Sequence, residues 1–134
     1  MNPLSKHLHT GTVGELLIQL RLLQHHVQAA PPLKDTGNDL IAIKGSVFKA
    51  IQVKTTAGER VRLEAPDRFF HLLGLVRLEG EGEQLELDRC DVYLIPKESV
   101  DDVRAGDNGA LEQHRLTADL VDRLFADPGP PIPT

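Results

Sequence analysis

The sequence predicts an α/β domain. Three observations support this prediction. An amphipathic helix pattern runs from about Val13 to about His26, several short apolar runs bounded by turn residues follow it, and a second amphipathic pattern covers about 117–126. A chain that combines helix and strand patterns in this way is typical of two or three packed layers around one core. With 134 residues, it fits a single domain, which we place at 1–126.

The first helix is predicted to begin after Thr12, because Thr12 and Glu15 have the spacing of a capping box. Ile18 and Leu22 lie on the same side as Glu15 and form a second apolar face, which we expect another element or another subunit to cover. The main apolar stripe follows helical spacing and consists of Val13, Leu16, Leu17, Leu20, Leu23 and Val27.

The middle of the chain carries strand patterns. Pro31-Pro32 predicts an extended loop, and Gly45-Ser46 predicts a tight turn between two strands. The apolar run 69–78 fits either a buried strand or a short helix, because periodicity alone does not separate the two. Strands are expected at 27–30, 39–43, 50–55, weakly at 61–63, at 84–87 as an edge strand, and at 91–96 with a stop at Pro96.

The last third of the chain is expected to be mainly helical. Ser99 begins a short predicted helix that ends near Gly106. The helix at about 117–126 places Leu120, Val121, Leu124 and Phe125 on one side. The tail 127–134 contains four prolines, and we expect it to be extended or disordered.

Composition limits the function classes. The chain is 40% hydrophobic and 26% charged, as in soluble globular proteins, and no apolar run approaches the roughly 20 residues that span a bilayer. The segment 1–7 lacks the hydrophobic region of a signal peptide, so we expect a cytoplasmic protein without membrane contact. The single cysteine, Cys90, excludes an internal disulfide and a multi-cysteine metal site.

Charge is distributed unevenly along the chain. Residues 1–78 carry ten Lys/Arg and six Asp/Glu, a net of +4, whereas residues 79–134 carry five and fourteen, a net of −9. The basic half could present a phosphate-binding face, although exposed lysines on strand edges also serve to prevent aggregation. The candidate phosphate-contacting residues are Lys34, Lys44, Lys49, Arg60 and Arg62.

The strongest functional signal lies on the two central strands. Asp39 opens the strand 39–43, and Gln52 and Lys54 interrupt the apolar strand 50–55. Because strand side chains alternate, Gln52 and Lys54 project from one face, so that an acid, an amide and an ammonium could converge. Taken singly, Asp39 could be a turn residue, Lys54 a solvated lysine at a strand end, and Glu15 a helix cap. Their joint occurrence favours a site.

These residues and their order resemble the PD-(D/E)XK nuclease superfamily. The resemblance is narrower to its homing-endonuclease-like branch, and secondarily to archaeal Holliday junction resolvases. The motifs that carry it are Gly11-Thr12-Val13-Gly14-Glu15, Asp39, Ile51-Gln52-Val53-Lys54-Thr55 and Val92-Tyr93-Leu94-Ile95-Pro96. The resemblance implies a restriction-endonuclease-like core, with a mixed central sheet flanked by helices in αβββ-αβ order.

The resemblance also implies hydrolysis of DNA phosphodiester bonds with Mg²⁺, for which Mn²⁺ can substitute, and without an organic cofactor. By analogy, Asp39 is the main metal ligand, the side-chain oxygen of Gln52 and the carbonyl of Val53 lie at the metal, and Glu15 contributes from the helix. Lys54 would orient the attacking water and stabilise the developing charge.

Three features depart from the family pattern. Gln52 replaces the commoner acid, Asp39 follows Asn38 instead of a proline, and the second half of the chain is acidic. The alternative function is therefore a weakly active or inactive nuclease-like fold that binds nucleic acid or a protein. In either case we expect a homodimer or tetramer, formed partly through the Ile18/Leu22 face.

Overall fold

The computed structural model describes residues 6–33, 39–57, 63, 69–106 and 108–127. Its central feature is a sheet of five strands in the spatial order β1-β2-β3-β4-β5. β1, β2 and β3 are antiparallel, β3 and β4 are parallel, and β4 and β5 are antiparallel, so the sheet is mixed as predicted. The strands are β1 (Gln28–Ala30), β2 (Leu40–Lys44), β3 (Val47–Thr56), β4 (Leu72–Arg77) and β5 (Asp91–Pro96).

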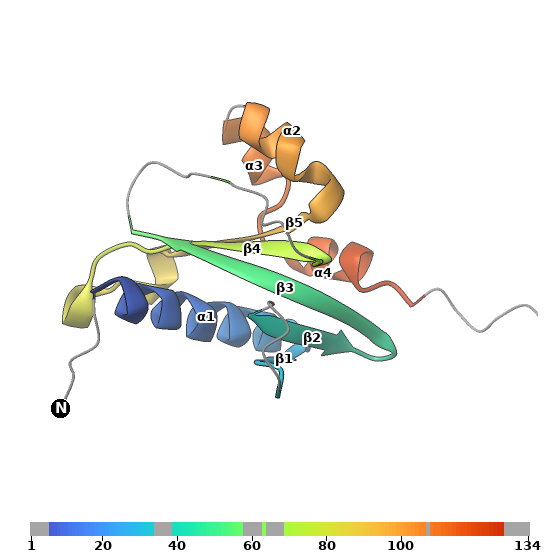
Figure 1. The fold of residues 1–134 in the computed structure, drawn as a ribbon, viewed down its shortest axis with the longest axis horizontal. Helices are drawn as coiled ribbons and strands as arrows, with labels where there is room; N and C mark the ends of the chain where they lie inside the picture. Colours follow the sequence, from blue (N-terminus) through green and yellow to red (C-terminus); the bar gives the residue numbers. More distant parts are fainter. Residues whose placement is uncertain (1–5, 34–38, 58–62, 64–68, 107, 128–134) are drawn as a thin grey trace, which may run out of the picture.

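Helices cover both faces of this sheet, which confirms the α/β class (Figure 1). The α-helices are α1 (Lys6–Gln24), α2 (Val100–Ala105), α3 (Asn108–Glu112) and α4 (Ala118–Leu124). α1 and α4 contribute to one hydrophobic cluster, and α2 and α3 contribute to a second one. Residues 114–116 run along the free edge of β5, where Leu94 N donates to His114 O and Leu116 N donates to Val92 O.

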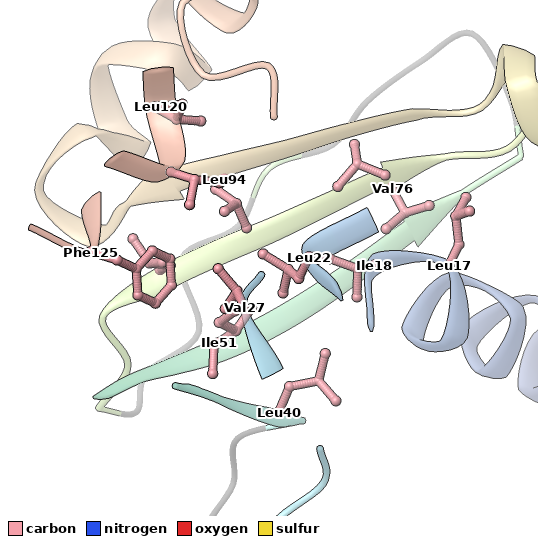
Figure 2. Packing of buried hydrophobic residues seen from close by; sticks show 14 of the residues in the cluster. Leu17, Ile18, Leu22, Val27, Leu40, Ile51, Val76, Leu94, Leu120 and Phe125 are labelled. Carbon is pink, nitrogen blue, oxygen red and sulfur yellow. The ribbon is translucent and has the colours of Figure 1, made fainter. Parts of the chain in front are cut away.

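The two clusters follow from strand alternation. On β5, Val92 and Leu94 belong to the cluster of α1 and α4, whereas Tyr93 and Ile95 belong to the cluster of α2 and α3. Figure 2 shows how the first cluster closes, with side chains from α1, β3, β4, β5 and α4 meeting in one core. Both faces of β4 are therefore buried, which explains its uninterrupted apolar sequence.

The start of α1 was predicted wrongly, and its main apolar stripe was predicted only in part, since Leu17 is buried. The expectation that another element covers Ile18 and Leu22 is confirmed. The helix begins at Lys6, so Thr12 is an interior residue, and the capping alternative for Glu15 is wrong as well. Ile18 and Leu22 are fully buried in the chain's own core. Among the residues of α1 whose burial the structure describes, the exposed large apolar side chains are Leu16, Leu20 and Leu23, at 59%, 46% and 59%.

This correction also removes the predicted interface through the Ile18/Leu22 face. Ile18 lies so close to Gly74 of β4 that a Cβ at Gly74 would overlap its Cδ1 atom. The side chains of Ile18 and Leu22 are therefore covered by the sheet, and a second subunit cannot reach them.

Most other predicted elements are confirmed. Strands occur in 27–30, 39–43, 50–55 and 91–96, and the ambiguous run 69–78 contains β4. The short helix predicted to begin at Ser99 is α2, and Thr117 caps α4, since its Oγ1 accepts a hydrogen bond from Leu120 N at 3.1 Å. α3 was not predicted.

One predicted strand is wrong. Residues 84–87 do not pair with another strand among the described residues; instead, 3-10 turns occupy Gly82–Gln84 and Leu87–Arg89. Leu63 lies in no strand, residues 61 and 62 lie outside the described residues, and so does the tail from residue 128 onward. Within the part of the chain that the structure describes, no helix has the length and apolar character needed to cross a membrane.

Candidate active site

A polar cleft opens where β2 stops covering the edge of β3. The last paired residues of the two strands are Leu40 and Ile51, so the second half of β3 extends beyond β2. The cleft has a volume of about 300 Å³ and lies between this free edge and the first half of α1. Its lining residues are Thr10, Gly11, Glu15, Asp39, Gln52, Val53, Lys54 and Thr55. The structure thus brings together all the residues proposed for catalysis and metal binding.

Asp39 is fixed by hydrogen bonds to β3. Its Oδ2 atom accepts one hydrogen bond from Val53 N at 2.8 Å and another from Gln52 Nε2 at 2.9 Å, while its own N–H donates to Ile51 O at 3.1 Å. The carboxylate therefore accepts from the backbone N–H group of Val53, which lies beyond the last paired residues of β2 and β3. Because these contacts run to the neighbouring strand, the turn-residue alternative does not account for the position of this side chain.

Gln52 contributes an oxygen that lacks a partner. Its amide nitrogen donates to Asp39, and Oε1 is the one buried side-chain polar atom among the described residues that has no hydrogen bond. An unpaired buried carbonyl oxygen costs about 1–3 kcal/mol. A cation held by Asp39 would favour the opposite orientation of the amide, with Oε1 towards the cation.

Glu15 reaches the cleft because α1 approaches β3 unusually closely. Gly14 is buried against the side chain of Thr55, and a Cβ at Gly14 would overlap that side chain. Burial raises the pKa of Glu15 above its ordinary value, and the negative charge of Asp39 raises it further. The two carboxylates therefore repel each other, and a cation between them would relieve the repulsion.

Lys54 is available for a ligand. Thr55 faces α1, so Lys54 projects from the opposite face of β3, on the same side as Gln52. The Lys54 side chain is exposed and has no ion-pair partner in the described part of the chain.

The proposed phosphate-contacting residues are not gathered at the cleft. Lys44 forms an ion pair with Asp122 of α4 at 3.3 Å and lies five residues from Asp39, roughly 17 Å along β2. Lys49 is half-buried near His71, three residues or about 10 Å from Gln52. Lys34, Arg60 and Arg62 lie outside the described residues.

The donor set of the cleft fits a hard divalent cation. It offers the carboxylates of Glu15 and Asp39 and the unpaired amide oxygen of Gln52. The carbonyl of Val53 points to the same edge as its N–H group, which faces Asp39. The described residues contain no group of three or more His, Cys, Asp or Glu that could hold a metal. A donor set of two carboxylates, one amide oxygen and one backbone carbonyl suits Mg²⁺, which binds few protein oxygens and keeps several waters.

Two features of the site were not predicted from the sequence. Thr10 lines the cleft, and the contact between Gly14 and Thr55 positions Glu15. A glycine inside a leucine-rich helix is a detectable signal of close packing, but it does not identify the partner residue. No protein-family model, curated protein or solved structure shows a significant match to this chain. The functional assignment therefore depends on the chemistry of the cleft.

Proposed function

We propose that this chain is a metal-dependent DNA endonuclease of the PD-(D/E)XK type, which hydrolyses phosphodiester bonds in the cleft between α1 and β3. The observation that carries this proposal is the convergence of Glu15, Asp39, Gln52 and Lys54, from one helix and two strands, on one cleft of about 300 Å³. Two carboxylates, with an amide oxygen and an ammonium group that have no partner among the described residues, supply both a cation site and a contact for a phosphate.

The order of elements also supports a restriction-endonuclease-like core. α1 is followed by antiparallel β strands and then by β4, which runs parallel to β3. A parallel neighbour requires a crossover connection, which here corresponds to 57–71. Its described residues, 57, 63 and 69–71, are not helical, and residues 58–62 and 64–68 lie outside the described part of the chain, so the support comes from the strands alone.

In this mechanism each side chain has one task. Asp39 and Glu15, with the oxygens of Gln52 and Val53, would hold Mg²⁺, which when bound polarises the phosphate and lowers the pKa of a bound water. Lys54 binds the scissile phosphate and offsets its increasing negative charge. The water oxygen forms a bond to phosphorus and gives up a proton to solvent, the bond between phosphorus and a sugar oxygen breaks, and the leaving oxygen takes up a proton from solvent.

Gln52 should make the site dependent on its substrate. A neutral amide in place of a carboxylate removes one negative charge, so the free protein should bind Mg²⁺ weakly. A substrate phosphate in the cleft would restore that charge. We therefore expect metal and DNA to bind cooperatively.

The test is nicking of supercoiled plasmid with Mg²⁺ or Mn²⁺ and with EDTA. Wild type should nick only with metal, and Asp39→Asn and Lys54→Ala should both be inactive. Asp39→Asn keeps an oxygen that can accept from Val53 N, and circular dichroism checks that its fold is intact. Lys44→Ala is the matched control, because its ion pair with Asp122 lies away from the cleft. Equal nicking by Asp39→Asn would contradict the proposal.

The second candidate is a nuclease-like binding module. Gln52 and the net charge of −9 in residues 79–134 favour it. Salt-sensitive DNA binding without metal-dependent cleavage would support this candidate, whereas no DNA binding at low salt would favour a protein partner.

A further inference from the structure

Two phenylalanines are exposed, and one of them lies on the strand that lines the cleft. The sequence has four phenylalanines, and Phe48 and Phe69 expose 62% and 67% of their surface. Large aromatic side chains supply much of the apolar burial in a core and in interfaces. Exposure of both rings on one part of the sheet therefore indicates a surface that contacts a ligand.

Both rings lie on the side of β3 that carries Gln52 and Lys54. Phe48 is four residues before Gln52 and six before Lys54, so strand alternation places all three on one face. Phe69 reaches the same region through His71, whose Nδ1 atom accepts from Ala50 N at 2.8 Å. The rings of Phe69 and His71 meet edge to face, with their centroids 4.9 Å apart.

Positive charge accompanies these rings. Lys97 Nζ lies 5.9 Å from the centre of the Phe69 ring and 5.2 Å from that of Phe70. Lys54 and Lys97 have no carboxylate partner among the described residues, whereas Arg77 and Arg115 both pair with Asp91. This face of the sheet thus offers two ammonium groups without a carboxylate partner among the described residues, and that of Lys97 lies beside the exposed ring of Phe69.

We propose that this face of β3 binds single-stranded DNA, with bases stacked on Phe48 and Phe69 and phosphates near Lys54 and Lys97. The proposal rests on the proposed function, because it continues the substrate strand from Lys54. Phe48 lies six residues from Lys54, about 20 Å along the strand, which corresponds to about six nucleotides at B-form spacing.

The chemistry selects an unpaired strand. Aromatic side chains bind single strands by stacking on bases, and a positively charged groove follows the backbone. In a duplex both faces of each base are covered by neighbouring pairs, so exposed rings gain little from it. The favoured substrate is therefore single-stranded DNA, or a duplex with a single-stranded flap that runs along β3.

A tryptophan reporter tests this directly, because the sequence contains no tryptophan. Phe48→Trp and Phe69→Trp are titrated with oligo-dT and with a duplex of equal length, in EDTA so that no cleavage occurs. Both variants should show saturable quenching by oligo-dT that weakens with salt, and little quenching by the duplex. Leu87→Trp is the control, since Leu87 is 49% exposed but lies in the 3-10 turn beside Asp88 and Glu86, and its fluorescence should not change.

Affinity provides the second measurement. Phe48→Ala and Phe69→Ala should each weaken oligo-dT binding by roughly 5- to 100-fold, as expected for the loss of one stacked base. Unchanged fluorescence of both tryptophan variants at saturating oligo-dT would overturn the proposal, and so would equal binding of the duplex. Quenching that depends on protein concentration without DNA would overturn it in favour of self-association.

The two proposals can fail separately. Quenching without any plasmid nicking would leave the single-strand site intact and remove the nuclease function. Nicking that requires Asp39 without quenching at Phe48 or Phe69 would do the reverse.

Discussion

Gly14 of α1 packs against the side chain of Thr55 on β3, at a distance that leaves no room for a Cβ atom. This contact brings the helix onto the strand at the cleft, and the next residue in the helix is Glu15. Glu15 therefore lies at the cleft because residue 14 is a glycine and has no side chain.

Gly14→Ala should destabilise the protein by about 1–3 kcal/mol, because the new methyl group must displace Thr55 or the helix. Denaturant unfolding followed by circular dichroism measures this change. Gly11→Ala is the control: nothing lies within 4 Å of a Cβ at Gly11, so alanine should stabilise this interior helix position by about 0.5–1 kcal/mol.

The double variant Gly14→Ala/Thr55→Gly moves the side chain from the strand to the helix. It should recover part of the stability lost in Gly14→Ala, since no Thr55 atom then opposes the methyl group. If the double variant is less stable than Gly14→Ala by the full cost of a glycine in a strand, the contact does not limit the approach of α1.

Gln52→Glu should make the fold depend on a divalent cation. The substitution replaces the N–H donor to Asp39 Oδ2 by a carboxylate, so the variant should unfold at a lower temperature than wild type in EDTA. Added Mg²⁺ should raise its melting temperature more than that of wild type, because a cation now links the carboxylates. Gln52→Ala, which loses the donor without adding charge, should show no such gain. Equal shifts for Gln52→Glu and wild type would argue against a cation site here.

His71 should make stability fall in mild acid. Burial lowers the pKa of His71, and so does the charge of Lys49. The neutral ring accepts a hydrogen bond from Ala50 N, which a protonated Nδ1 cannot do. Because the folded pKa lies below the unfolded value of about 6.5, the contribution is complete above that pH and is lost as the pH falls through the folded pKa.

Urea unfolding at pH 7 and pH 5 tests this contribution. His71→Gln keeps an oxygen acceptor but does not titrate, so its stability should change less between the two pH values. Some dependence should remain from His114, whose pKa is lowered by burial and by Arg123. An identical pH dependence of wild type and His71→Gln would exclude a role for His71.

The predicted homodimer or tetramer can be tested on the exposed face of α1. Leu16, Leu20 and Leu23 follow helical spacing and form an exposed stripe on α1. A two-fold axis places each residue of such a stripe close to the same stripe of the second copy, and these three residues carry no charge that would repel it. Light scattering should show wild type as an oligomer whose mass falls on dilution. Leu20→Glu should be monomeric, whereas Leu33→Glu, at an exposed leucine outside the helix, should match wild type.

Strand prediction succeeded where turn residues bounded apolar runs. Gly45 has a φ of 61° in the turn between β2 and β3, a conformation that favours glycine, and Pro96 is the last residue of β5. Each of these two residues therefore indicated the end of a strand for a physical reason. The segment 84–87 alternates in the same way but contains no strand, because period two is also compatible with successive tight turns. The sequence pattern does not show whether a neighbouring strand is available to pair with 84–87, and this decides between a strand and turns.

The buried face of α1 could not be read from periodicity. The helix carries large apolar residues on more than one side, and the choice between Ile18 and Leu16 depends on where Gly74 and Ile51 leave space. The convergence of Asp39, Gln52 and Lys54 was accessible, since it follows from alternation and from the turn between β2 and β3. The position of Glu15 depends on helix–sheet packing, which the sequence pattern does not encode locally.

The parallel pairing of β3 with β4 also has a consequence for the time at which the cleft forms. All four proposed site residues precede residue 55, yet Ile18 and Ile51 pack onto β4, and β4 is in turn covered by β5 at 91–96. Such pairings join residues that are distant in sequence, and loops of this length must close before the contacts form. During synthesis, a nascent chain that already contains the complete set of site residues should therefore lack an ordered cleft until β5 has emerged.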